Sequence, residues 1–193
     1  MELFSTYLFY VSIILMLSGF LFLFKVPRCK NYNVQLSEKI SIIIPARNEE
    51  HNIGNLLQSL KNQDYQADEI IVVNDDSTDN TKEIAIKLGA KVIDSKSLPE
   101  GWLGKPWACY QGAQNATNEI LMFLDSDTII EKNGLKKIIS TFLHHNKISV
   151  HVMSIAPFHK IKKLYEEFSA VFNIIMTGSM NAFTPFKNLK ATG

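Results

Sequence analysis

The feature that most constrains the fold is a regular alternation of short apolar runs with segments of helical spacing. The first run, Ile-Ser-Ile-Ile-Ile at residues 40–44, is closed by Pro45. A short β-branched run of this kind is typical of a strand that is buried on both faces of a parallel sheet. Parallel strands need long connections, and the helical segments between the runs supply them. The sequence therefore predicts an α/β domain with a mostly parallel sheet and helices on both faces.

The other expected elements follow from the same two periodicities. Strands are predicted at 40–44, 69–73, 91–93, 120–124 and 148–153, and helices at 49–62, 78–88, 105–117, 133–145 and 160–176. Gly89 lies just past the second of these helices, where a glycine cap is favoured. The last helix has an apolar face and a cluster of lysines at its start, so it either packs on the core or lies on a membrane surface.

The N-terminal segment carries no charged residue from Leu3 to Phe24. As a helix at ~1.5 Å per residue it would be about 33 Å long, enough to cross a hydrocarbon core. A signal peptide would need a basic start and a small-residue cleavage site, and the sequence has neither. We therefore expect a membrane anchor at 1–24 in the cell membrane, a linker at 25–38 and a catalytic domain at 39–193. Basic residues directly after the anchor predict that this domain is cytoplasmic.

Polar and acidic residues follow three of the predicted strands. In an open parallel sheet, ligands bind beyond the carboxyl ends of the strands, so these residues should meet at one edge. The three groups are Arg47, Asn48 and Glu49; Asp75 and Asp76; and Asp125 and Asp127. Taken alone, the first group could be the acidic first turn of a helix, the second could be a helix cap, and the third could be two acids that occur on a loop by chance. Carboxylates crowded at one edge repel one another unless a cation or ligand lies among them, so the set together indicates a binding site.

The residue types suggest separate roles at this edge. Asp125 and Asp127 flank one small residue and can hold a hard divalent ion, Mg²⁺ or Mn²⁺, with positions left open for diphosphate oxygens. Asp75 or Asp76 can accept hydrogen bonds from a base or a ribose hydroxyl. Lys105, with the arginine of the first group, supplies positive charge for a base or a diphosphate.

Several other classes of protein are excluded or disfavoured. A dinucleotide-binding fold needs Gly-x-Gly-x-x-Gly after the first strand, where this chain has Pro-Ala-Arg-Asn-Glu-Glu. A phosphoacceptor signalling domain would not explain Asp-x-Asp or the apolar N-terminus. The balance of 20 basic and 19 acidic residues gives no general attraction to nucleic acid. Cys29 and Cys109 form no Cys-x-x-Cys pair, so zinc or redox chemistry is not expected.

These motifs as a set resemble the family 2 glycosyltransferases of the GT-A fold, which have a Rossmann-like sheet. The stretches that carry the resemblance are Ile42–Glu50, Val72–Asp79, Asp125–Asp127, Gly104–Gly112 and Tyr165–Asn173. The closer resemblance is to the membrane-bound branch that acts on carotenoid acids. It implies an inverting, metal-assisted transfer of a sugar, expected to be glucose, from a UDP-sugar to a lipid-like acceptor. Two alternatives stay open, a donor-binding fragment without activity and a transferase for another membrane lipid or a polysaccharide.

The resemblance also implies a role for individual residues. Asp75 and Asp76 would contact the uridine, Lys105 would approach the diphosphate, and Asp125 and Asp127 would form the metal motif. The rest of the nucleotide pocket would be lined by Pro45, Arg47, Asn48 and Glu49. Members of the family continue beyond a Gly-Pro segment to an acidic motif with the catalytic base. The chain ends at Gly193 without it, so we expect an incomplete domain whose base lies beyond residue 193.

Overall fold

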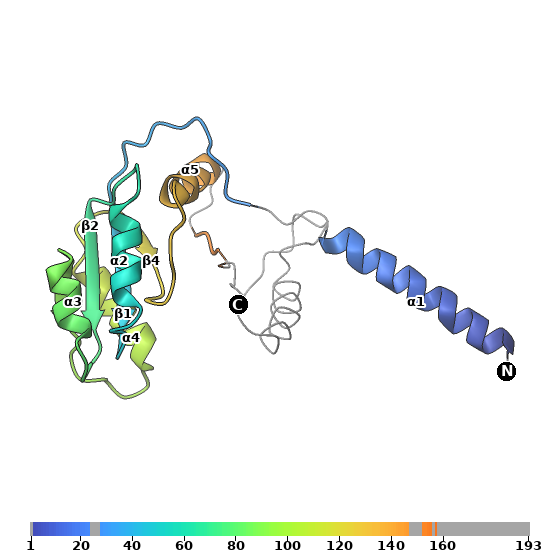
Figure 1. The fold of residues 1–193 in the computed structure, drawn as a ribbon, viewed down its shortest axis with the longest axis horizontal. Coiled ribbons are helices and arrows are strands. Elements are labelled where there is room, and N and C mark those ends of the chain that lie inside the picture. Colours follow the sequence, from blue (N-terminus) through green and yellow to red (C-terminus); the bar gives the residue numbers. More distant parts are fainter. Residues whose placement is uncertain (1, 24–27, 147–151, 156, 158–193) are drawn as a thin grey trace. The chain divides into compact units, whose positions relative to one another are not determined.

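The computed structural model describes residues 2–23, 28–146, 152–155 and 157. The chain divides into two compact units, and Cys29–Met153 forms the unit that contains the sheet. Figure 1 shows this unit as a twisted sheet with helices packed against it. The predicted helix at 160–176 lies outside the described residues, as does most of the predicted strand at 148–153, whose last two residues are in no strand.

Within the residues that the structure describes, the sheet has four parallel strands in the order β3-β2-β1-β4. The strands are β1 (Ile40–Ala46), β2 (Glu69–Asn74), β3 (Lys91–Asp94) and β4 (Ile120–Phe123). Every residue of β1 is buried, because neighbouring strands flank it on both sides and helices cover it on both faces. This burial explains why its sequence is a nearly continuous β-branched run rather than an alternating one.

Helices cover both faces of the sheet, as the sequence predicts. On one face, α2 (Ile53–Lys61), α3 (Thr81–Lys87) and α5 (Gly134–Asn146) share an apolar core with alternate residues of β1. The buried side chains of α2 fall at i, i+3, i+4 and i+7, which is the spacing of one helix face; they are Ile53, Leu56, Leu57 and Leu60. On the other face, α4 (Gly104–Gln114) packs through Ala108 against Ile43 and Val73.

The helices begin or end a few residues inside their predicted ranges. Residues 49–52 form turns before α2, since the backbone N–H groups of Asn52 and Ile53 both donate to the carbonyl oxygen of Glu49. Residues 78–80 similarly precede α3. Gly89 has φ +79°, so it ends that helix in the left-handed conformation that its position predicts.

The segment predicted as a linker is fixed to α5 where the structure describes it. The backbone N–H of Lys30 donates to Thr141 Oγ1 at 2.9 Å, and Ser140 Oγ donates to the carbonyl oxygen of Lys30 at 2.9 Å. Tyr32 stacks on His144 with ring centroids 3.9 Å apart. Two neighbouring hydroxyl groups on α5 therefore satisfy both backbone groups of one residue of the segment, which sequence periodicity could not reveal.

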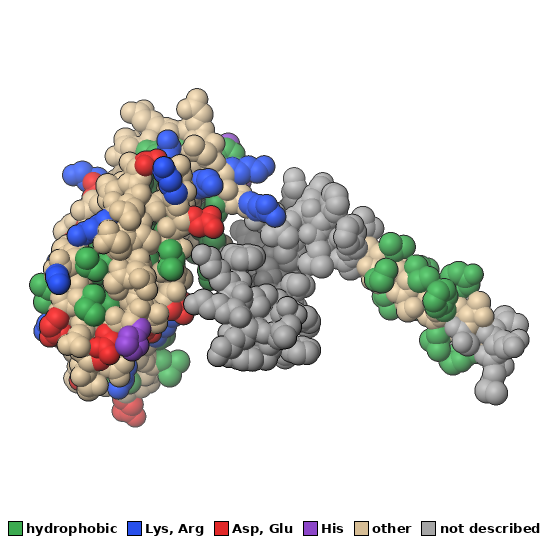
Figure 2. Space-filling view, in the orientation of Figure 1, with side chains coloured by type: hydrophobic (Ala, Val, Ile, Leu, Met, Phe, Trp, Pro, Cys, Tyr) green, Lys and Arg blue, Asp and Glu red, His purple; other side chains and the backbone are tan. Residues whose placement is uncertain are grey.

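Residues Glu2–Leu23 form a separate helix, α1, in the other compact unit. Hydrophobic side chains lie along the face of this helix that Figure 2 shows, and Phe4, Phe9 and Met16 are each more than half exposed. Among the residues that the structure describes, however, no helix combines the length and the apolar character needed to cross a membrane. The expectation of a transmembrane anchor at 1–24 is therefore not supported by the described part of α1, whose side chains are described only within residues 4–17.

Candidate active site at the carboxyl edge of the sheet

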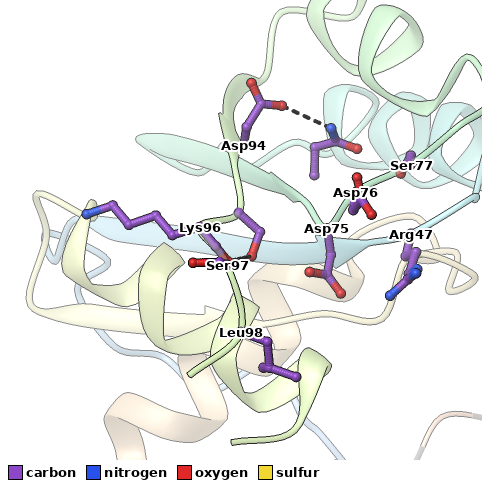
Figure 3. Close-up of a pocket in the computed structure, with 10 residues that line it drawn as sticks. Arg47, Asp75, Asp76, Ser77, Asp94, Lys96, Ser97 and Leu98 are labelled. Atoms are coloured by element: carbon purple, nitrogen blue, oxygen red, sulfur yellow. Dashed lines mark hydrogen bonds between the residues drawn. The ribbon is translucent and has the colours of Figure 1, made fainter. Parts of the chain in front are cut away.

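The ends of β1, β2 and β3 surround a pocket of about 490 Å³. Its walls come from the last residues of β2 and β3 and from the segments that follow the three strands (Figure 3). The lining residues are Arg47, Asn74, Asp75, Asp76, Ser77, Asp94, Ser95, Lys96, Ser97 and Leu98. The structure thus brings three of the predicted site residues, Arg47, Asp75 and Asp76, into one cavity at the expected edge of the sheet.

The loops after β1 and β2 are locked together by hydrogen bonds. The backbone N–H of Asn48 donates to Ser77 Oγ at 3.1 Å, and Asn48 Oδ1 accepts from the backbone N–H of Thr78 at 2.8 Å. The backbone N–H of Glu49 donates to Thr81 Oγ1 at 2.8 Å. Asn48 and Glu49 therefore join the two loops rather than line the pocket. Pro45 lies buried within β1, where it pairs in register with Val73.

The two aspartates after β2 are presented differently. Asp76 lines the pocket and has φ +57°, a left-handed conformation that aspartate adopts more readily than most residues. Asp75 lies against the first turn of α4, since a Cβ added at Gly104 would be 3.3 Å from Asp75 Oδ2. A helix N-terminus favours a nearby carboxylate, so this position suits the negative charge of Asp75.

The wall that follows β3 was not predicted, although the same strand-end rule points to it. Two side chains of α4 hold the backbone of Lys96 from either side. Its N–H donates to Gln111 Oε1 at 2.8 Å, and its carbonyl oxygen accepts from Trp107 Nε1 at 3.0 Å. Gln111 is buried and also donates to Ser95 Oγ at 2.8 Å. The sequence signal that could have found this wall is the polar run Ser-Lys-Ser directly after the third strand.

A chain of polar side chains closes the pocket between β2 and β3. Lys82 of α3 lies 2.6 Å from Asp94 Oδ2, and Asn74 Nδ2 donates to Asp94 Oδ1 at 3.0 Å (Figure 3). The hydrogen bonds from Lys82 and from Asn74 lower the pKa of Asp94. An ionised carboxylate can only accept, so it fixes the Asn74 amide with its Nδ2 group toward Asp94. Within the described residues, the buried Oδ1 of Asn74 has no hydrogen-bond partner.

Lys105 and Asp125 form an ion pair next to this pocket. Lys105 Nζ lies 2.6 Å from Asp125 Oδ1, which joins the first turn of α4 to the segment after β4. The hydrogen bond that Lys105 donates to Asp125 is the main reason why the pKa of Lys105 is raised, and the charge of Asp127 adds to it. The structure thus brings Lys105, Asp125 and Asp127 into one electrostatic cluster, but none of them lines the pocket itself.

The segment after β4 suits a divalent cation with few protein ligands. Thr128 closes a turn by donating its backbone N–H to the carbonyl oxygen of Asp125 at 3.1 Å. Ser126 is buried in this turn, whereas Asp125 and Asp127 on either side of it are exposed. The described residues contain no group of three His, Cys, Asp or Glu side chains that could enclose a metal. Mg²⁺ usually takes only one or two carboxylates and completes its shell with water and phosphate oxygens, so the pair fits it.

The two tryptophans pack together on one side of α4 and its preceding loop. Trp102 lies 5.1 Å from Trp107 and 5.3 Å from Tyr110, measured between ring centroids. Trp107 stacks on Tyr110 at 5.6 Å. Trp107 also holds the wall of the pocket through Lys96, whereas Trp102 remains 40% exposed. Trp107 therefore has a structural contact with the site, and Trp102 presents a ring to solvent.

Comparison with known proteins identifies the family. Residues 41–189 match the model of glycosyl transferase family 2, which is more than half of the chain. The chain belongs to glycosyl transferase family 2. All four strands of the sheet lie within or directly at the start of this match. The parallel α/β sheet and the transferase class expected from the sequence are thereby confirmed.

Individual relatives of this family 2 chain are known from two staphylococci. The 4,4'-diaponeurosporenoate glycosyltransferase of Staphylococcus aureus (strain bovine RF122 / ET3-1) is 40% identical over 149 residues, which cover 76% of this chain and 39% of the relative. The enzyme of the same name from Staphylococcus haemolyticus (strain JCSC1435) is 39% identical over 159 residues, covering 81% of this chain and 42% of the relative. The chain thus spans about two fifths of the length of these relatives.

Solved structures of similar proteins overlap with a smaller part of the family 2 chain. Glucosyl-3-phosphoglycerate synthase from Mycobacterium tuberculosis, in complex with Mn²⁺, UDP and glucosyl-3-phosphoglycerate, is 29% identical with a TM-score of 0.46, covering 57% of this chain and 40% of that chain. TarS of Staphylococcus aureus is 35% identical with a TM-score of 0.48, covering 56% of this chain and 33% of that chain.

Proposed function

We propose that this chain binds the sugar donor of an inverting glycosyltransferase, and that the donor is a UDP-sugar. The observation that carries the proposal is the pocket at the carboxyl edge of the sheet, which combines Arg47 with Asp75 and Asp76. The two carboxylates can accept hydrogen bonds from base and ribose, and the guanidinium can donate to base carbonyl oxygens or to phosphate. Membership in glycosyl transferase family 2 also supports a role of this pocket in binding the sugar donor.

The donor would extend from this pocket toward Lys105 and Asp125. β2 and β4 are separated only by β1, so their ends lie about two strand spacings, or ~10 Å, apart. A nucleoside diphosphate with its base beside β2 would therefore bring its phosphates near the ammonium group of Lys105. A divalent ion held by Asp125 and Asp127 would neutralise the charge that develops on the departing nucleoside diphosphate.

The acceptor that we propose is a lipid-like molecule with a hydroxyl or carboxyl group, such as a carotenoid acid, and the sugar is glucose. The relatives are named for 4,4'-diaponeurosporenoate, a name whose ending denotes a carboxylate. An apolar acceptor of this kind is found in or at a bilayer. We therefore propose a cytoplasmic location at the cell membrane, supported by the exposed apolar side chains of α1. Recovery of the chain in the soluble fraction after cell lysis would contradict that location.

The test of donor binding is calorimetry with UDP on the full chain in detergent, with Mn²⁺ or with EDTA. We expect binding that depends on the metal, and Asp127→Asn should weaken it by at least a few-fold because a charged ligand of a hard cation is lost. The matched control is Asp64→Asn, which makes the same change in an exposed aspartate in the loop before β2, at the opposite edge. Equal UDP affinity with Mn²⁺ and with EDTA would contradict the metal site, and no UDP binding would contradict the donor.

A further inference from the structure

The ion pair between Lys105 and Asp125 puts a positive charge where the proposed cation would bind. Lys105 Nζ lies 2.6 Å from Asp125 Oδ1, so an N–H group of the ammonium is directed at a carboxylate oxygen that a metal would need. The charge of Asp127 also acts on this ammonium group. One carboxylate of the metal motif is thus already paired with a positive side chain of the same protein.

We propose that Lys105 occupies the place of the cation on Asp125 in the free protein and leaves it when a diphosphate enters. The inference rests on the proposed function, because it needs both a metal and a diphosphate at this edge. An ammonium group and a divalent ion on one carboxylate repel each other, so each weakens the other's binding. A diphosphate offers Lys105 other oxygens, which removes this competition. Metal and nucleoside diphosphate should therefore bind cooperatively, and Lys105 would be a positioning residue for the metal as well as a donor contact.

The strength of the ion pair fits such an exchange. The side chains of Lys105 and Asp125 are 61% and 59% exposed, so water screens the attraction between them. Exposed pairs of this kind change an equilibrium by only about two- to fivefold. An ion pair of that strength is strong enough to lower the affinity for a metal measurably. It is also weak enough for Lys105 to exchange Asp125 for a phosphate group.

The competing explanation is that the pair only fastens α4 to the segment after β4. In that case, removing the ammonium group would loosen the turn that holds Asp125 and Asp127, and metal affinity would fall or stay the same. The proposal predicts the opposite sign. The direction of the change in metal affinity therefore separates the two explanations, whatever its size.

The experiment measures binding of Mn²⁺ alone to the full chain, from the paramagnetic resonance signal of free Mn²⁺, without nucleotide. Lys105→Met keeps most of the length of the side chain and removes its charge, and we expect about two- to fivefold tighter Mn²⁺ binding. The matched control is Lys91→Met, which removes the same charge from another ion pair, that with Glu69 at 3.0 Å, at the opposite edge of the sheet. This control should leave Mn²⁺ affinity close to that of the unaltered chain.

A second measurement separates this inference from the proposed function. UDP should bind Lys105→Met more weakly than the unaltered chain, and UDP should raise Mn²⁺ affinity less in the variant than in the unaltered chain. Mn²⁺ affinity in Lys105→Met that is no higher than in Lys91→Met would overturn the inference, while metal-dependent UDP binding by the unaltered chain would leave the proposed function intact. No Mn²⁺ binding by either chain would overturn the metal site and the inference together.

Discussion

Replacing Glu69 by glutamine tests how the sheet is fastened at the edge opposite the pocket. Glu69 begins β2, and its carboxylate accepts hydrogen bonds from three neighbouring segments. Ser41 Oγ of β1 donates at 2.7 Å and Lys91 Nζ of β3 at 3.0 Å. The backbone N–H of Thr117, before β4, donates at 2.9 Å and its hydroxyl at 3.1 Å. One carboxylate therefore connects the starts of all four strands.

The expected magnitude follows from the pKa of Glu69. Burial raises this pKa, but the hydrogen bonds from Thr117, Ser41 and Lys91 together outweigh burial and lower it from 4.5 to about 2. Such a difference corresponds to about 3 kcal/mol at neutral pH if the unfolded chain has the ordinary value. The Glu69 side chain is only 14% exposed, but that of Lys91 is 45% exposed, so part of the attraction is screened. We expect Glu69→Gln to lower the free energy of unfolding by about 1–3 kcal/mol.

The pH dependence has a definite sign. A group whose pKa is lower in the folded state stabilises the fold fully above its unfolded pKa, and this contribution is lost as the pH falls toward the folded value. For Glu69 the stabilisation should be complete above about pH 4.5 and should decline toward about pH 2. Glutamine cannot ionise, so the difference between the two proteins should shrink over the same range.

Urea denaturation followed by circular dichroism, at pH 7 and at pH 3.5, measures both effects. The difference in unfolding free energy between the unaltered chain and Glu69→Gln should be smaller at pH 3.5 by about a third. Glu119→Gln is the matched control, since Glu119 is an exposed carboxylate in the loop before β4. Equal stability of Glu69→Gln and the unaltered chain at pH 7, or a difference that does not vary with pH, would refute this account of Glu69.

Two further substitutions test the packing of α4, on which the wall of the pocket depends. Gly112→Ala should lower the free energy of unfolding by about 1–3 kcal/mol, because the new methyl group would collide with Ile43 Cγ2 and lie 3.0 Å from Val73 Cγ2. An unchanged midpoint in urea denaturation would mean that α4 can move away from the sheet. Trp107→Phe should keep the aromatic stacking but lose the hydrogen bond to the carbonyl oxygen of Lys96. Calorimetry should then show UDP binding weakened a few-fold, with little change in the free energy of unfolding. Unaltered UDP affinity would mean that this wall of the pocket does not contribute to donor binding.

The sheet was predictable because its strands are buried and its helices are amphipathic. The apolar run Ile40–Ile44 predicts a buried strand. The helical spacing of apolar residues predicts which face of α2 packs on the core; these residues are Ile53, Leu56, Leu57 and Leu60. Helix starts were less predictable, since residues 49–52 and 78–80 make side-chain and turn hydrogen bonds that compete with helix formation. The side-chain bonds join residues 29 to 32 positions apart in the sequence, which periodicity does not reveal.

The same distinction applies to the site. Arg47, Asp75 and Asp76 could be placed in the pocket because each directly follows a strand. Asn48 and Glu49 follow a strand as well, but their hydrogen bonds to Ser77, Thr78 and Thr81 hold two loops together. Whether a strand-end residue faces a ligand or a neighbouring loop depends on tertiary contacts. The wall formed by Lys96 was missed because its position depends on Gln111 and Trp107, which belong to a helix later in the chain.

The order of the strands explains why a pocket and a separate charged cluster lie at one edge. The chain adds β2 and then β3 on one side of β1, and it returns through α4 to place β4 on the other side. The helix that makes this crossover packs on β1 and β2 and runs opposite to the strands, so it begins at their carboxyl edge. Its first turn therefore reaches Asp75 through Gly104 and Asp125 through Lys105. The first turn of one helix thus connects the proposed base pocket to the proposed metal motif. A structural change in either of them can therefore affect the other.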